Sequence, residues 1–402
     1  MLHRALALLL LTLHAGQESD LSCADWLKSP TSDREIALRD VPKARKALWD
    51  KYVAEVRADK RRKAEHEARA IKIGDLTMKF ASTPVGEKPG PGWPLYIALH
   101  GGGQADPSVN DSQWDHMKVY YRESVKAGLY VAPRGMTDTW NLHFVDASYP
   151  AYDRLIENFI AFESVDPNRV YLLGFSAGGD GTYAVAPRMA DRWAAANMSA
   201  GHPNGVSPVN LMHVPFLVQV GEKDTAYDRH KAAATFFVAL GELRAKHPAH
   251  YVHAASIHAG RPHNFLDNHP KRAPQRVIKD PAAWLKDGAG ETEERDTNAI
   301  SWLDAYVRPP LPPRVVWDLT TTASTRGVAG RRHYWLDLGD RDPAKEESKR
   351  ISVRLDKKTN GVIVEECGPW LRVLLTDGML DCRSRSWSRS AARRRPSGRR
   401  RG

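Results

Sequence analysis

A serine stands in the middle of a glycine-rich segment, Gly174-Phe175-Ser176-Ala177-Gly178-Gly179. This G-x-S-x-G pattern is typical of a nucleophile elbow, where a strand turns sharply into a helix and presents a serine hydroxyl at its tip. Gly174 and Gly178 leave room for such a turn, in which a Cβ would clash. The pattern is short enough to arise by chance, so the rest of the chain must supply the groups that make a serine reactive.

A serine hydroxyl is a weak nucleophile until a neighbouring base takes its proton. In this kind of site, an acid follows the serine in the chain and a histidine follows the acid. Asp224 comes just after the apolar run Pro215–Val220 and is the expected acid, with Asp228 and Glu222 as alternatives. A structural role for Asp224, as the N-cap of a helix that follows it, is the other interpretation.

The expected base is His263, in the turn-rich segment that follows the strand-like run Tyr251–Ile257. It would act as general base toward Ser176 and then as general acid toward the leaving group. His258 and His269 are close in the sequence, and either could replace it. Any of the three could equally be a surface histidine.

A glycine run, His100-Gly101-Gly102-Gly103, follows the predicted strand Trp93–Leu99. Glycines let the backbone approach a substrate and direct N–H groups at a developing oxyanion. We expect the N–H groups of Gly102, Gly103 and Ala177 to form this oxyanion hole. The alternative interpretation is that the glycine run is a flexible turn.

Two further side chains follow predicted strands and could line the substrate pocket. Trp140 comes after the strand Tyr130–Ala132, and His202 comes after the short strand Ala194–Ser199. An aromatic ring there would suit an aryl or acyl ester, although Trp140 is equally suited to ordinary packing. The sequence has no metal-ligand constellation and no cofactor fingerprint, so we expect neither a metal nor a cofactor.

The glycine run, the elbow, the acid and the histidine together resemble the α/β-hydrolase superfamily. Within it the chain is similar to secreted esterases and polyester depolymerases, and to the catalytic domain of the prolyl-oligopeptidase (S9) family. The resemblance covers about residues 71–308 and implies a Ser176–His263–Asp224 triad with an acyl-enzyme mechanism. No segment of β-propeller size precedes residue 71, unlike full-length prolyl oligopeptidases, which favours an esterase over a peptidase.

Strand-like and helix-like runs alternate through residues 71–308. This order predicts an α/β fold with a doubly wound, mainly parallel sheet covered by helices on both faces. We expect strands at Ile71–Phe80 and Arg169–Leu173, a turn at 166–168, and helices at Met117–Ala127 and Thr182–Trp193, with Pro187 interrupting or ending the second helix. Because sites in such sheets lie at the carboxyl ends of the strands, the polar clusters above should meet at one edge.

Other segments flank the predicted catalytic domain. Residues 1–16 are typical of a secretory signal peptide that is too short to span a bilayer, or of a buried N-terminal helix. Residues 17–70 form a helical segment whose Val41–Ala70 part is amphipathic. A stiff Pro-rich linker at 309–314 precedes a small β-domain at 315–382, which could bind a polymer or cap the catalytic domain. We therefore expect a secreted or periplasmic protein with no membrane span.

The net charge of +11 is concentrated at the C-terminus. Residues 383–402 hold nine arginines and no acid, so subtracting nine from +11 leaves only +2 for the rest of the chain. This Arg-rich tail is an anionic-surface or nucleic-acid anchor, a disordered end, or the product of a reading-frame shift near Asp381-Cys382. Since the remainder is nearly neutral, no nucleic-acid partner is expected.

The three cysteines, Cys23, Cys367 and Cys382, do not make a dense disulfide framework and lack metal-site spacing, although one bridge is possible with one cysteine left over. No feature of the sequence predicts an oligomeric state. The leading hypothesis is a secreted serine hydrolase that cleaves small-molecule or polymeric carboxylic esters. The alternatives are a serine peptidase of the prolyl-oligopeptidase type and a non-catalytic protein that binds surfaces through the β-domain and tail.

Overall fold

The structure is a computed structural model that describes residues 38–269, 274–322, 330–368, 371–376 and 378–380. The predicted signal peptide at 1–16 and the Arg-rich tail at 383–402 lie outside the described residues, as do Cys23 and Cys382. The reading-frame interpretation of the tail is likewise not addressed by the structure.

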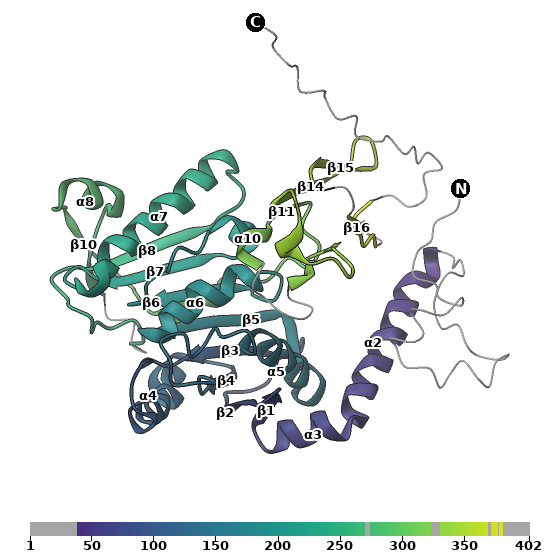
Figure 1. Ribbon diagram of the computed structural model, residues 1–402, viewed down its shortest axis with the longest axis horizontal. Coiled ribbons are helices and arrows are strands. Elements are labelled where there is room, and N and C mark those ends of the chain that lie inside the picture. Colours follow the sequence, from purple (N-terminus) through teal and green to yellow (C-terminus); the bar gives the residue numbers. More distant parts are fainter. Residues whose placement is uncertain (1–37, 270–273, 323–329, 369–370, 377, 381–402) are drawn as a thin grey trace, which may run out of the picture.

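A ten-stranded sheet, in the order β1-β2-β4-β3-β5-β6-β7-β8-β9-β10, runs through the molecule (Figure 1). Strands β3 to β8 are parallel to one another, while β1, β2, β9 and β10 add antiparallel edges. The strands are β1 Ala70–Ile73, β2 Leu76–Val85, β3 Trp93–Leu99, β4 Gly128–Pro133, β5 Val165–Phe175, β6 Ala195–Ser199, β7 Phe216–Gly221, β8 His253–His258, β9 Gln275–Ile278 and β10 Thr292–Arg295.

Helices cover both faces of this sheet because its central strands are apolar on both sides. On β3, Leu95 and Ile97 belong to one buried cluster and Tyr96 to the other. The first cluster includes residues of α5 Ser148–Glu163, α6 Ala177–Arg188, α7 Arg229–Lys246 and α8 Pro281–Asp287. The second includes residues of α4 Pro107–Tyr120 and α9 Ala299–Leu303. The predicted fold class, an α/β fold with a doubly wound and mainly parallel sheet, is confirmed.

The segment ahead of the sheet consists of two helices, α2 Val41–Ala58 and α3 Lys60–Glu67. They are separate because Asp59 adopts an extended conformation and its side chain caps α3. Arg57 Nε donates to the carbonyl oxygen of Ala161, and Arg62 Nη2 pairs with Glu157 at 2.7 Å, so both helices are tied to α5 (Figure 1).

Beyond α9, six short strands form two antiparallel sheets, β11-β14-β15 and β12-β13-β16. They are β11 Arg314–Asp318, β12 Arg332–His333, β13 Leu336–Asp337, β14 Arg350–Asp356, β15 Gly361–Glu366 and β16 Arg372–Val373, with a helical turn α10 at Leu319–Thr322. The predicted small β-sheets are therefore present. They have their own core around Trp317, but Val316 joins the main core, and His213 Nε2 bonds the Arg314 carbonyl oxygen at 2.6 Å.

Two local expectations were wrong. The helix expected at 117–127 is α4, which begins at Pro107 and ends at Tyr120, because proline is well suited to a first helical turn. The turn expected at 166–168 lies within β5. The expectation that Pro187 interrupts or ends the helix after the elbow is confirmed, because α6 ends at Arg188.

Candidate active site

Ser176 lies between the end of β5 and the start of α6, at the tip of a sharp turn. Its backbone has φ 59° and ψ −121°, a conformation that costs a non-glycine residue about 1–3 kcal/mol. A Cβ at Gly174 would collide with the carbonyl oxygen of Gly178, and a Cβ at Gly178 with that of Leu99. Neighbouring backbone therefore enforces the strained turn that exposes the Ser176 hydroxyl.

Ser176, His263 and Asp224 form a continuous hydrogen-bonded line. His263 Nε2 lies 3.0 Å from Ser176 Oγ, and His263 Nδ1 lies 2.8 Å from Asp224 Oδ2. A carboxylate can only accept, so Nδ1 must carry the proton and donate it, which leaves Nε2 free to accept from the serine hydroxyl. The imidazole is thus oriented to take a proton from Ser176.

Asp224 is 3% exposed and is held by the loop after β7. Its N–H donates to the Gly221 carbonyl oxygen at 3.0 Å, and its own carbonyl oxygen accepts from His230 N–H at 3.2 Å. Arg229 Nη1 lies 3.6 Å from Oδ1, the carboxylate oxygen that does not face His263. The buried carboxylate is therefore fixed in position with a cation beside it.

Two of the alternative residues, Glu222 and His258, have hydrogen-bond partners other than the candidate triad. Glu222 Oε2 accepts the N–H of Gly260 at 2.6 Å, and Asp228 adopts a left-handed conformation at the start of α7. His258 is buried, stacks on Phe265 and pairs with Gln219, and burial lowers its pKa to about 3. Of the three candidate histidines, His263 is the one hydrogen-bonded to Ser176.

The glycine run lies against the elbow and is anchored by its histidine. An ideal Cβ at Gly101 would lie 3.4 Å from Ser176 Cβ. His100 Nδ1 donates to the Gly101 carbonyl oxygen at 2.6 Å, and His100 Nε2 accepts from Gly135 N–H at 3.0 Å. Burial lowers the pKa of His100 to about 4, so the ring stays neutral and ties the loop to the segment after β4.

The structure changes one expectation for the oxyanion hole. Gly102 and Gly103 have φ of 102° and 82°, conformations that glycine alone adopts readily. Gly103 N–H donates to Asn110 Oδ1 at 2.8 Å, so this expected oxyanion donor is already engaged by a side chain of the protein. Within the described residues, the N–H groups of Gly102 and Ala177 have no hydrogen-bond partner, and both remain candidates.

Trp140 lies beside the glycine run, whereas His202 lies beside the first turn of α6. The carbonyl oxygen of Trp140 is 3.2 Å from an ideal Cβ at Gly103, and its side chain is 50% exposed. His202 N–H donates to Asp180 Oδ1 at 2.7 Å, and its Nδ1 accepts from Asn204 N–H at 3.0 Å. Contact of either residue with a substrate stays a prediction.

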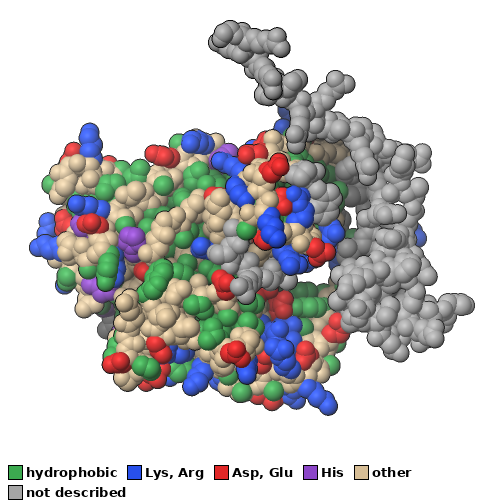
Figure 2. Space-filling view, viewed as in Figure 1, with side chains coloured by type: hydrophobic (Ala, Val, Ile, Leu, Met, Phe, Trp, Pro, Cys, Tyr) green, Lys and Arg blue, Asp and Glu red, His purple; other side chains and the backbone are tan. Residues whose placement is uncertain are grey.

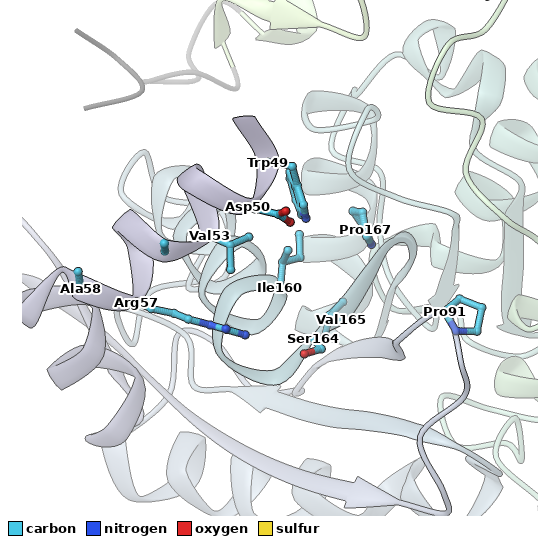
Figure 3. Close-up of a pocket in the computed structure, with 11 residues that line it drawn as sticks. Trp49, Asp50, Val53, Arg57, Ala58, Pro91, Ile160, Ser164, Val165 and Pro167 are labelled. Carbon is cyan, nitrogen blue, oxygen red and sulfur yellow. The ribbon is translucent and has the colours of Figure 1, made fainter. Parts of the chain in front are cut away.

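A cleft of about 740 Å³ lies far from Ser176, between α2 and the start of β5 (Figure 3). Trp49, Asp50 and Val53 line it from α2, and Val165 lines it from the first residue of β5. Because Ser176 follows the last residue of β5, this cleft is at the opposite edge of the sheet and is separate from the hydrogen-bonded line.

Other kinds of site are not evident in the part of the chain that the structure describes. These residues contain no group of three or more His, Cys, Asp or Glu placed to hold a metal ion. Across 38–269, 274–322 and the shorter described ranges beyond, no helix is long and apolar enough to cross a membrane. On the face drawn in Figure 2, basic and acidic side chains are interspersed.

Comparison with known proteins gives similarities of fold. No protein-family model and no curated protein matches the chain. Solved structures with similar folds include a thermostable esterase (TM-score 0.40, 20% identity, 60% of this chain and 62% of that one). A poly(3-hydroxybutyrate) depolymerase from Bordetella parapertussis has TM-score 0.39 at 17% identity over 57% of this chain and 88% of that one. An acylaminoacyl peptidase from Pyrococcus horikoshii has TM-score 0.35 at 14% identity over 54% and 38%.

The chain thus spans under two thirds of the length of that esterase, and all three identities are at or below 20%. Similarity at this level does not indicate which substrate this chain acts on. The class of protein that the chain resembles, the α/β-hydrolase superfamily, follows from the strand order and the elbow.

Proposed function

We propose that this protein is a serine hydrolase that cleaves carboxylic esters through an acyl-enzyme on Ser176. The observation that carries the proposal is the line from Ser176 Oγ through His263 to Asp224, with distances of 3.0 and 2.8 Å. A serine, an imidazole and a buried carboxylate in this order are the groups that acyl transfer needs.

The reaction would begin when Ser176 Oγ attacks the ester carbonyl carbon while His263 Nε2 takes the hydroxyl proton. Asp224 would stabilise the imidazolium that forms and hold the ring in place. The oxyanion would accept from the N–H groups of Gly102 and Ala177, the latter at the N-terminus of α6, where the helix dipole favours negative charge.

The tetrahedral intermediate would collapse when His263 gives its proton to the leaving alkoxide, which departs as an alcohol. A water molecule would then attack the acyl carbonyl carbon while His263 accepts its proton. The second tetrahedral intermediate would collapse as His263 returns that proton to Ser176 Oγ, which breaks the bond between Oγ and the acyl carbon and releases the carboxylic acid. We place Trp140 and His202 at the substrate-binding edge of this site.

The test is labelling with a fluorophosphonate probe together with turnover of an aryl ester. Ser176→Ala should lose both the label and the turnover, whereas Ser301→Ala, in α9 away from the elbow, should keep both. Unchanged hydrolysis by Ser176→Ala would exclude Ser176 as the nucleophile. A folded wild-type protein without label or turnover would favour the non-catalytic surface-binding alternative.

An ester and an amide of the same acyl group separate the two hydrolase hypotheses. Either kind of enzyme should turn over the ester, because an alkoxide leaves more readily than an amine, so the amide rate decides: an esterase should cleave the amide slowly or not at all. Faster turnover of the amide would instead identify a peptidase of the prolyl-oligopeptidase type.

We also propose that the protein is exported, on the basis of the leader-like composition of residues 1–16. Expression of the full chain, followed by N-terminal sequencing of the secreted or periplasmic product, tests this. A product that still begins at Met1 in the cytoplasmic fraction would contradict it.

A further inference from the structure

Asn110 is a fully buried amide in the first turns of α4, and all of its hydrogen-bonding groups face loops at the candidate site. Its Oδ1 accepts the N–H of Gly103 at 2.8 Å. Its Nδ2 donates to the Ala105 carbonyl oxygen at 3.1 Å and to Asp138 Oδ1 at 2.8 Å. A buried polar side chain is costly unless satisfied, so these three bonds specify one orientation of the amide.

The Asp138 carboxylate is fixed in turn by Arg134, which follows directly after β4. Arg134 Nη2 bonds Asp138 Oδ1, its Nε bonds Asp111 Oδ1 at 2.8 Å, and its Nη1 donates to the carbonyl oxygens of Gly135 and Thr137. The hydrogen bond from Arg134 holds the pKa of Asp138 below its usual value, so Asp138 remains an acceptor for the Asn110 amide.

Gly102 and Gly103 depend on contacts from other residues because they have no side chains that could fix their conformation. Gly102 and Gly103 both have positive φ, and a Cβ at Gly102 would collide with Asn110 Oδ1. Loss of the bond to Asn110 would let the Gly102–Gly103 segment sample several conformations, since glycine is the least restricted residue.

We propose that Asn110 is a positioning residue for the oxyanion donor. By binding Gly103 N–H it fixes the backbone between Gly102 and Gly103, so that the unpartnered N–H of Gly102 is held toward the substrate oxygen. Arg134 and Asp138 fix Asn110 itself. This inference rests on the proposed function, because it assigns a role within the same acyl transfer.

A positioning role predicts a specific kinetic pattern. The negative oxygen forms only in the transition state, so a misplaced donor lowers kcat and leaves KM nearly unchanged. Removing an oxyanion donor outright costs about 100- to 1,000-fold in kcat, and loosening one should cost less, about 10- to 100-fold.

The experiment compares Asn110→Ala with Asn210→Ala. Asn210 is also fully buried and bonds backbone, at Asp318, but lies at the junction with β11. Both variants should lower the melting temperature. Only Asn110→Ala should lower kcat by about 10- to 100-fold with KM changed less than about threefold. A folded Asn110→Ala with wild-type kcat overturns the inference.

Exchanging the amide of Asn110 and the carboxylate of Asp138 provides a second test if Asn110→Ala does not fold. Asn110→Asp places two carboxylates together and loses both amide donors, so kcat should fall. Adding Asp138→Asn restores a donor between the two positions and should recover most of the lost kcat. Failure of the folded double variant to recover overturns the inference. Wild-type protein that neither takes the fluorophosphonate label nor cleaves esters overturns the proposed function, and this inference with it.

Discussion

The N–H of Ser176 donates to the carbonyl oxygen of Ser199, 2.9 Å away across the ends of β5 and β6. The hydroxyl of Ser199 donates to Asp267, which is four residues beyond His263. Ser199 therefore contacts both the backbone of the candidate nucleophile and the loop that carries the candidate base. The distance between Ser176 Oγ and His263 Nε2 depends on this junction as well as on the two residues themselves.

Replacing Asp267 should destabilise the protein strongly. Asp267 is fully buried and accepts from Tyr120 Oη at 2.9 Å, Tyr121 Oη at 2.7 Å and Ser199 Oγ. Asp267→Ala leaves three hydroxyl donors without this acceptor, at about 1–3 kcal/mol for each buried group that stays unsatisfied. Urea unfolding should show a loss of about 3 kcal/mol or more. Exposed Asp287→Ala is the control, and a loss for Asp267→Ala equal to that of the control would contradict the prediction.

Adding a methyl group at Gly178 should prevent the elbow from folding. At Gly178 a Cβ would overlap the carbonyl oxygen of Leu99, which belongs to a central strand that cannot move aside. Gly178→Ala should therefore yield little folded protein or a melting temperature lowered by several degrees. Gly90→Ala, where a Cβ meets nothing within 4 Å, is the matched control. Equal melting temperatures for the two variants would show that the elbow tolerates the methyl group.

The residues that lie together around Ser176 could be singled out from the sequence because each is marked locally. Gly174 and Gly178 are required by close backbone approach at fixed spacing from Ser176, and each partner follows an apolar run that becomes a central strand. Chain order then selected Asp224 and His263. Buried parallel strands have near-continuous apolar runs, so they were also the easiest elements to recognise.

The edge strands and Asn110 could not be predicted in the same way. Strands β9 and β10 are partly exposed, so residues 275–295 carry no clear apolar alternation. Asn110 appears in the sequence as one polar residue in a helix, and its role depends on the approach of Gly103 and Asp138 in three dimensions. The same contact engages the Gly103 N–H, which no local sequence pattern indicates.

Asp224→Asn should reduce turnover without unfolding the protein. Since an amide can donate, it would favour the wrong tautomer of His263, in which Nε2 carries the proton and cannot accept from Ser176. For this kind of change we expect kcat to fall by about 10⁴-fold. Asp228→Asn is the control because Asp228 lies outside the hydrogen-bonded line. A fall of similar size in both variants would contradict the assignment of Asp224.

Acid should weaken the junction between the main sheet and the C-terminal strands. Burial lowers the pKa of His213 to about 4 and that of His333 to about 4, from an ordinary value of 6.5. His213 Nε2 bonds the carbonyl oxygen of Arg314, and His333 stacks on Trp317, so both rings lie among residues of this junction.

A histidine whose pKa is lower in the folded state binds protons better when unfolded. Its contribution to stability is therefore fully present above about pH 6.5 and is lost as the pH falls toward 4, at about 1.4 kcal/mol for each unit of pKa difference. The free energy of unfolding, measured in urea at pH 7, 5.5 and 4.5, should decrease over this range. His213→Gln keeps a donor but does not titrate, so its decrease should be smaller, whereas exposed His116→Gln should follow the wild type. A His213→Gln profile parallel to that of the wild type would show that His213 contributes nothing to the acid sensitivity.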